Sequence, residues 1–531
     1  MFYIQQDRFK VYARILIWIA TIFFYIRGES LSIIYCVGAI EIFYIIIQLT
    51  IEDVPDIMYR LSKHRIKRGL YKDAEGIKSA AFLYLITMGT IGVCTLSILS
   101  KYFVSTKHLV YTSNFMKLLC IAIIVFTLLN YIRGLVVIKA SRLILGISYI
   151  VQVVIALIYI NIKYLPKVSY ANKLITLLQQ EHIVYFYAGL VVVEAIIWSA
   201  ICVAVLLGGL LIFNRFTVGH STKMNLIDKS ETLAQQVVLI AKTVFLNSFP
   251  KAIIHIPFIV IYFWGIDQVL VGNKLMGHFF GLVLPIILCM SDIDNLSFIK
   301  IETLFKKEVA MREIKKIKSL TRFIMVRSFY GTIITTVLYI VSIPCILKLV
   351  ELNQDVAISK LAYASASFIL FIMPVKYLGM VLSVQKRGVY VVIAGGLSTV
   401  VLMAGCFFIY ARNAFTYSLI IKTVTLFMGI YTVLLLFIIM EIYRIKKQIL
   451  TNAIILMLLV GGIIGIILYW ITYLFLPVIG AIAVIVAQIV LAYPIYLTMI
   501  IFTNIFSKRD MELLGCKKLN NMILGIMGRK V

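Results

Sequence analysis

Long apolar runs separated by short polar segments make up most of this chain. A membrane-spanning helix needs about 20 mostly apolar residues, and about fourteen runs approach or exceed that length. They cover residues 11–26, 31–51, 80–100, 114–132, 143–162, 183–213, 238–264, 275–299, 321–347, 359–384, 389–411, 415–441, 450–474 and 477–506. The pattern predicts an all-α polytopic membrane protein with about fourteen transmembrane helices.

The overall composition supports lipid as the solvent of this fold. Of the 531 residues, 62% are hydrophobic and only 14% are charged. Soluble domains average about 45–50% apolar and about 25% charged residues, so water could not accommodate this much apolar surface. No small-residue cleavage site follows the first run, which we therefore interpret as an uncleaved span rather than a signal peptide.

The net charge of +28 comes from basic residues in the loops between the apolar runs. If each run crosses the membrane once, the most basic segments all fall on one side. These segments are residues 60–78, 133–142, 306–318, 386–387, 444–447 and 508–518. The positive-inside rule then predicts a multi-pass plasma membrane protein with both termini in the cytoplasm, where the basic loops meet membrane lipid. Without an aromatic-and-basic groove pattern or a nucleic-acid motif, we expect no nucleic acid partner.

Two stretches of the chain resemble each other. Ile77-Lys78-Ser79 and Ile317-Lys318-Ser319 each precede or open an apolar run, 240 residues apart, and the turns at 134–142 (GLVVIKASR) and 379–387 (GMVLSVQKR) lie 245 apart. Two basic loops can look alike by chance, but two matches at nearly one offset favour a parallel repeat. We predict an N-terminal six-helix lobe at 1–220, a C-terminal six-helix lobe at 221–448, two additional transmembrane helices at 449–506 and a cytoplasmic tail at 507–531.

The tail has the pattern of an amphipathic helix. Leu519, Met522, Ile523, Ile526 and Met527 recur at helical spacing between basic residues. Such a helix lies on the membrane surface or packs on the protein's own cytoplasmic loops, and the pattern does not decide between the two.

Catalytic motifs are missing from the sequence. It has no GxxxxGK[ST] phosphate loop, no GxSxG and no HExxH, and its six histidines are scattered. The loops on the expected external side are too short to form a catalytic domain, the longest being at about 163–182. We therefore predict no enzyme activity, no cofactor and no metal site.

Polar residues inside the spans are the candidates for function. A charge near the bilayer centre costs at least about 2.5–3.5 kcal/mol, so it usually faces a cavity or a partner. Lys251 and His255 lie on one face of the seventh run between Pro250 and Pro257, which loosen the backbone as in broken transporter helices. Cationic groups there suit an anionic substrate such as a diphosphate. The alternative is that Lys251 forms a structural ion pair with an intramembrane glutamate.

Glu41 in the second run and Glu194 in the sixth are the glutamates in question. For these two glutamates there are two alternatives: they bind a coupling cation or proton, or they serve only as counter-charges. Arg133 and Asp294 lie near span ends, where charged side chains usually reach the interface.

Several segments resemble the multidrug/oligosaccharidyl-lipid/polysaccharide (MOP) flippase superfamily. The exit of the second span, with Val54-Pro55, Leu61-Ser62-Lys63 and Gly69, resembles the phrase that precedes that superfamily's third span. Segments 27–35, 131–152 and 281–308 resemble its first turn, its fourth-to-fifth turn and the second-lobe junction, although that junction lacks the proline of the first. The tail at 507–528 is similar to the ending of stage V sporulation protein B-like members.

The resemblance implies two six-helix lobes around a central cavity, as in MATE transporters and lipid II flippases, with Arg27 as a further cavity residue. It implies a flippase that moves a lipid-linked saccharide or polysaccharide precursor, of the undecaprenyl diphosphate type, to the outer leaflet by alternating access. Glycosyltransferases or polysaccharide-synthesis proteins would be its partners. The alternatives are a cation-coupled multidrug exporter of the same superfamily and a non-transporting subunit of a polysaccharide-export complex.

Overall fold

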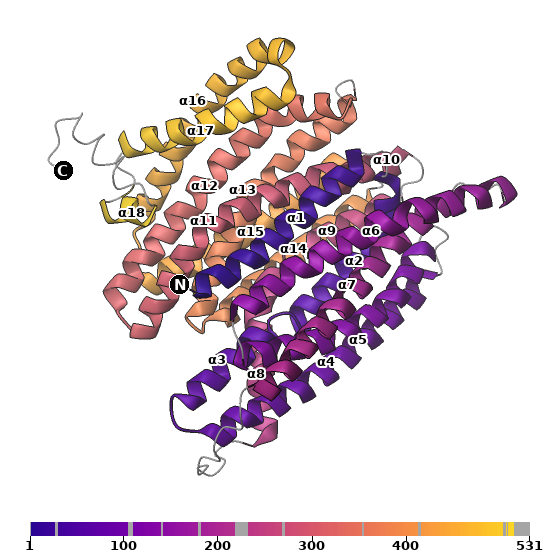
Figure 1. The fold of residues 1–531 in the computed structure, drawn as a ribbon. Coiled ribbons are helices and arrows are strands. Elements are labelled where there is room, and N and C mark those ends of the chain that lie inside the picture. Colours follow the sequence, from indigo (N-terminus) through magenta and orange to yellow (C-terminus); the bar gives the residue numbers. More distant parts are fainter. Residues whose placement is uncertain are drawn as a thin grey trace. The chain divides into compact units, whose positions relative to one another are not determined.

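The computed structural model describes residues 2–26, 30–104, 110–139, 142–178, 182–217, 232–267, 271–352, 355–412, 416–502, 506 and 508–514. All regular structure in these residues is helical, which confirms the all-α fold class. Contacts between residues divide the chain into two compact units, Met1–Cys289 and Met290–Val531. Figure 1 colours the first unit from indigo to magenta and the second from pink to yellow.

The first unit contains the N-terminal helices. They are α1 (Phe2–Phe24), α2 (Ser30–Thr50), α3 (Val54–Ile66), α4 (Tyr71–Val104), α5 (Val110–Lys139), α6 (Arg142–Leu178), α7 (His182–Thr217), α8 (Leu233–Ala252), α9 (Ile256–Asp267), α10 (Val271–His278) and the π-helix η2 (Phe279–Val283). A buried apolar cluster joins α2, α3, α4, α5, α7 and α8 and includes Phe43, Phe115 and Leu119. α11 (Leu284–Met311) begins in the first unit and continues into the second.

The second unit contains the remaining helices. They are α12 (Ile314–Leu349), α13 (Val356–Val384), α14 (Gly388–Ala411), α15 (Tyr417–Tyr443), α16 (Lys447–Ile479), α17 (Ala481–Phe502) and the short α18 (Lys508–Leu513). The two additional helices α16 and α17 both pack on α12 (Figure 1). Gln488 of α17 joins them at a buried site, because its amide contacts Ser342 of α12 and Thr472 of α16. The residues of the predicted amphipathic tail from 515 onward lie outside the described residues.

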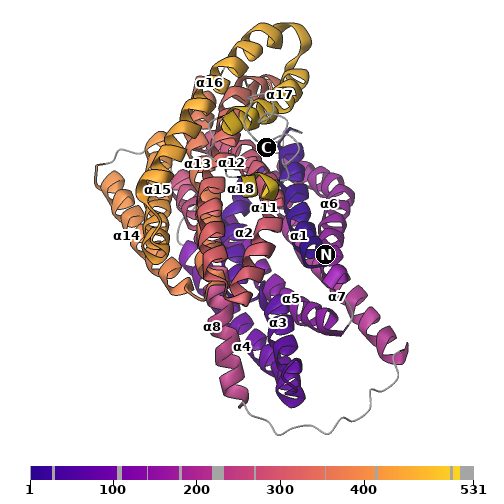
Figure 2. The same ribbon diagram turned by 90° about the vertical axis from the view of Figure 1, so that its left-hand side faces the viewer.

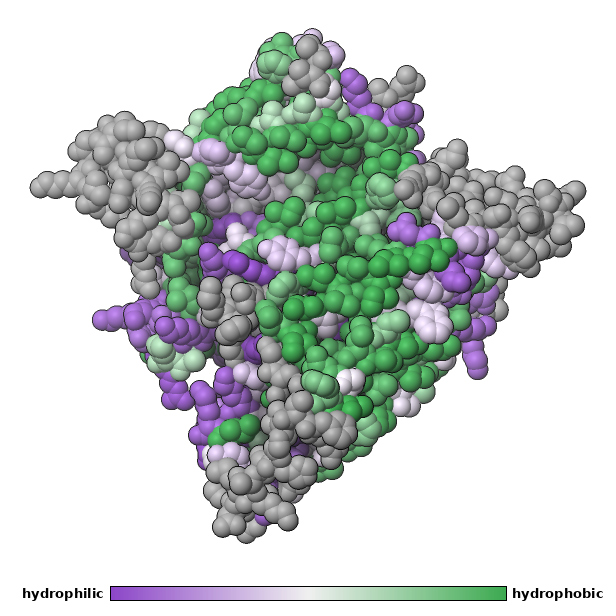
Figure 3. Space-filling model, viewed as in Figure 1, coloured by the Kyte–Doolittle hydropathy of each residue, from purple (hydrophilic) through white to green (hydrophobic). Residues whose placement is uncertain are grey.

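Eleven helices within the described residues are long and apolar enough to cross a membrane, and α8 with α9 would make a twelfth as one bent span. They fall on the predicted runs from the third to the fourteenth. α1 and α2 occupy the first two predicted runs, so the structure is compatible with fourteen spans. Apolar residues cover much of the face that Figure 3 shows, as expected for helices in contact with lipid chains.

The helices on either side of the repeated segments pack in the same order in both units. In the first unit α4 packs on α5, α5 on α7 and α6 on α7, and in the second unit α12 packs on α13, α13 on α15 and α14 on α15. The repeated turns also match locally, since residues with positive φ precede both α4 (Gly69, 76°) and α12 (Arg312, 58°). The junctions differ where the sequence differs. Pro55 stands in the first turn of α3, whereas α11 continues to Met311 without a break.

At the seventh predicted span, formed by α8 and α9, the division by contacts differs from the predicted lobe boundary. α8 and α9 follow residue 220 and so belong to the second six-helix lobe by sequence order. They pack on α2, and α8 also packs on α3 and α4, beside which it lies in Figure 2. The division by contacts therefore falls after Cys289. The boundary at 220/221 stays a prediction about the repeat, because a helix of one repeat can pack against the other.

Candidate functional site

The seventh predicted span is broken in the structure. α8 ends at Ala252, residues 253–255 form a turn, and α9 begins at Ile256 with a bend of 50° between the two helices. The cause is local. Pro257 has no N–H group, and in a continuous helix its ring would clash with the carbonyl of Ile253, whereas the first turn of a new helix tolerates proline. The backbone break that the two prolines predict is therefore present.

Both halves of this broken span contact other helices of the first unit, each at a position next to a glycine. The amide of Gln236 in α8 donates to the backbone of α4 over 3.3 Å, next to Gly76, where a Cβ atom would lie 2.7 Å from the Gln236 Oε1. The hydroxyl of Tyr262 in α9 lies 3.0 Å from that of Thr112 in α5. Its ring fills the space beside Gly38 of α2, where a Cβ atom would lie only 1.9 Å away. The two anchors hold the residues around the break in place.

Lys251, on the last turn of α8, contacts Asp53. Its Nζ lies 2.8 and 2.7 Å from the two carboxylate oxygens of Asp53, and the hydroxyl of Ser248 donates to the same carboxylate over 3.1 Å. The Lys251 side chain is 51% exposed, while that of Asp53 is 10% exposed. An internal ion pair is thus formed, with Asp53 rather than with Glu41 or Glu194.

His255 lies in the turn between α8 and α9 and contacts Glu41. Its Nδ1 is 2.9 Å from Oε2 of Glu41, and both side chains are mostly buried. A histidine and a carboxylate within hydrogen-bond distance can share and move a proton, which is the chemistry that a proton relay needs. Two of the predicted site residues therefore meet at the break.

Glu194 lies elsewhere in the first unit. Its carboxylate accepts hydrogen bonds from Lys167 at 2.5 Å and from the hydroxyl of Tyr159 at 2.9 Å, both on α6. The structure thus gives Glu194 its own cation and does not bring it to Lys251. Arg27, the remaining predicted site residue, lies outside the described residues.

Two charges expected at the interface are buried instead. Arg133 of α5 donates to the side chains of Ser148 and Gln152 of α6 and lies over the ring of Tyr149. Asp294 lies in the second unit and forms a separate cluster. The expectation that these two side chains reach the interface is wrong, because each has enough hydrogen-bond partners within the helix bundle to remain buried.

The cluster around Asp294 joins three helices of the second unit. Asp294 of α11 accepts from Arg327 of α12 at 2.6 Å and from the hydroxyl of Tyr377 of α13 at 2.7 Å, and Ser297 accepts a further bond from Arg327. The ring of Phe298 stacks on that of Tyr377. The sequence offered a partial signal for this cluster, since an arginine within an apolar run demands an anionic partner.

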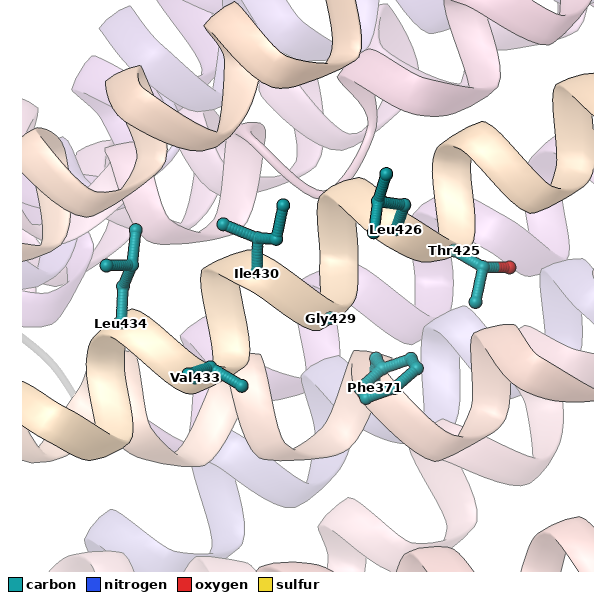
Figure 4. A pocket seen from close by; sticks show the side chains of 7 residues that line it. All are labelled: Phe371, Thr425, Leu426, Gly429, Ile430, Val433 and Leu434. Carbon is teal, nitrogen blue, oxygen red and sulfur yellow. The ribbon is translucent and has the colours of Figure 1, made fainter. Parts of the chain in front are cut away.

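An apolar groove lies on the surface of α13 and α15, with a volume of about 440 Å³. It is lined by Phe371, Thr425, Leu426, Gly429, Ile430, Val433 and Leu434 (Figure 4). Figure 4 shows Phe371 on α13 and the other residues on α15. The groove is lined by no charged side chain and lies within the second unit, on helices other than α8 and α9. Among the described residues, no three or more His, Cys, Asp or Glu side chains are grouped to hold a metal ion.

Comparisons with known proteins concern the fold. No protein-family model matches the chain, and no curated protein matches its sequence. Among solved structures, the lipid II flippase MurJ in an inward closed conformation is similar with a TM-score of 0.54 and 13% identity, covering 96% of this chain and 99% of that one. The eukaryotic MATE transporter AtDTX14 is similar with a TM-score of 0.54 and 12% identity, covering 85% of this chain and 97% of that one. The chain therefore has the MATE and lipid II flippase fold that its sequence predicts.

Proposed function

We propose that this protein is a membrane flippase of the MOP superfamily. It moves a lipid-linked saccharide or polysaccharide precursor, carried on an undecaprenyl-type diphosphate, from the inner to the outer leaflet of the plasma membrane by alternating access. Both termini are cytoplasmic in this proposal, and enzymes that build the saccharide supply the substrate. The fold is consistent with this function, but fold alone does not identify a substrate.

The observation that carries the proposal is the exposed cation on the broken helix. Lys251 stands at the end of α8 next to the bend, and half of its side chain is accessible while its partner Asp53 is buried. A lysine ammonium binds phosphate oxygens as a point charge, and diphosphate is the anionic part of the proposed substrate. Broken helices commonly form substrate sites in transporters, because the interrupted backbone and its side chains face a cavity.

Glu41 and His255 are the proposed coupling pair in this scheme. His255 lies four residues after Lys251 on the broken span and contacts Glu41 of α2, so a change in the protonation of this pair would act next to the substrate cation. Glu194, neutralised by Lys167, acts as a counter-charge within the first unit. We propose Arg27 as a further cavity residue on the strength of the sequence resemblance.

A cation-coupled drug exporter is the second candidate, because the chain resembles a MATE transporter and MurJ with the same TM-score. The extent of the likeness supports the flippase. The match with MurJ covers 96% of the chain and that with AtDTX14 covers 85%. The chain also has two helices, α16 and α17, beyond its two predicted six-helix lobes.

Translocation in reconstituted vesicles tests the proposal. Labelled undecaprenyl diphosphate saccharide is placed in the inner leaflet, and its appearance outside is measured with an impermeant reagent. We expect transport by the wild-type protein and its loss in Lys251→Met. Lys242→Met is the matched control, because Lys242 is an exposed lysine earlier on the same helix. Unimpaired transport by Lys251→Met would refute the role of this residue, and export of cationic drugs without saccharide transport would favour the exporter.

A further inference from the structure

Asp53 lies at the N-terminus of α3, but its side chain does not cap that helix. It is the N-cap residue of α3, the position at which an aspartate usually accepts a hydrogen bond from the first turn. Its side chain makes no such bond here. Both carboxylate oxygens instead contact Lys251, and one of them also accepts from Ser248. The carboxylate of Asp53 is therefore directed at the substrate cation of α8.

The exposure of the pair is uneven. The side chain of Asp53 is 10% exposed, whereas that of Lys251 is 51% exposed. Half of the Lys251 side chain is thus accessible although its ammonium group is paired with Asp53. Carboxylate and phosphate oxygens are equivalent acceptors for a lysine ammonium, so the two anions would compete for the same donor.

A second lysine adds to the positive charge around Asp53. Lys10 of α1 pairs with Asp56, on the first turn of α3, at 2.7 Å. Burial raises the pKa of Asp53, but the charges of Lys251 and Lys10 outweigh that effect and hold the pKa below its ordinary value. Asp53 is thus an ionised carboxylate near two cations and a hydroxyl. When Lys251 turns to another anion, Asp53 keeps its hydrogen bond from Ser248 and the electrostatic effect of Lys10, which itself stays paired with Asp56.

We propose that Asp53 is an internal competitor of the substrate, which holds Lys251 in the empty protein and yields it to a diphosphate oxygen when substrate binds. This inference rests on the proposed function and deepens it, because it assigns the diphosphate as the group that Lys251 recognises. Asp53 then sets the affinity for the anionic head group and keeps Lys251 neutralised between transport cycles.

Binding of a short diphosphate to the purified full-length protein in detergent tests the inference. Isothermal titration calorimetry with geranyl diphosphate, and with geranyl monophosphate for comparison, gives the affinity. Because a partly exposed ion pair contributes up to about a factor of five, we expect Asp53→Asn to bind the diphosphate about fivefold more tightly than wild type. Glu302→Gln, which removes a carboxylate paired with Lys306 in the second unit, should change the affinity less than twofold.

The variant Lys251→Met distinguishes competition for Lys251 from a general effect of removing the negative charge of Asp53. It should weaken diphosphate binding and abolish the gain from Asp53→Asn in the double variant. An Asp53→Asn variant that keeps the wild-type melting temperature but does not bind more tightly would overturn the inference, and so would an equal gain in the Lys251→Met background.

The two proposals can fail separately. If vesicles show no saccharide translocation while the diphosphate binding pattern holds, the flippase proposal fails and the role of Asp53 stands. If translocation is observed and Asp53→Asn leaves diphosphate affinity unchanged, the role of Asp53 fails alone.

Discussion

Removing Asp294 should destabilise the second unit more than any surface charge change. Asp294 and Arg327 are each 6% exposed, their charged atoms are 2.6 Å apart, and Tyr377 donates to the same carboxylate. Taking away one partner of a buried pair leaves the other charge uncompensated, at a cost of about 3–5 kcal/mol. We therefore expect Asp294→Ala to lower the free energy of unfolding by about that amount, and Arg327→Met to do the same.

The measurement is an SDS titration of the purified protein in mixed micelles, followed by circular dichroism. The control is Glu302→Ala on the same helix, which removes a partly exposed ion pair with Lys306 and should cost less than about 1 kcal/mol. The double variant Asp294→Ala/Arg327→Met removes both charges, so it should be no less stable than either single variant. A cost for Asp294→Ala equal to that of Glu302→Ala, or additive effects in the double variant, would refute the reasoning.

Two glycines lead to further predictions. A Cβ atom on Gly331 would lie 2.3 Å from Arg327, so Gly331→Ala should displace the buried pair and lower the free energy of unfolding by about 1–3 kcal/mol in the same titration. Gly462→Ala, with open space around it, is its control and should be neutral. Gly38→Ala would drive a Cβ atom into the Tyr262 ring and should undock α9, measured as faster hydrogen exchange in α9 but not in α4. Unchanged exchange in α9 would contradict the proposed anchoring.

The parts of the fold that follow from local chemistry could be predicted from the sequence. Span positions depend on runs of apolar residues, and the described helices fall on them. The break in the seventh span depends on Pro257 acting on its own backbone, so the sequence was sufficient there as well. The packing order shared by the two units was implied by the repeated turns, because sequences that form the same turns place their helices in the same order.

Pairing between distant charges was not predictable, because partner choice is decided by tertiary packing. The sequence indicated that Arg133 is a charge near a span end, yet not that Ser148 and Gln152 would satisfy it inside the bundle. It likewise placed Asp294 at the interface, although Arg327 lay in the next span as a possible partner. A buried charge can be recognised from the sequence as needing a partner, but the partner can be identified only from the fold.

The position of Lys251 along the bilayer illustrates why the candidate site was only partly predicted. The apolar run at 238–264 places Lys251 near its middle, where Glu41 or Glu194 was the expected partner. In the structure α8 also packs on α3 and α4, beyond the end of the second span, so Lys251 meets Asp53 at that end and His255 meets Glu41. One broken segment thus places a cation, Lys251, at the expected cytoplasmic end of the second span, and a histidine, His255, beside Glu41 further along that span. In the flippase that we propose, movement of this segment would change both contacts together, which would couple release of the substrate cation to the protonation of Glu41 and His255.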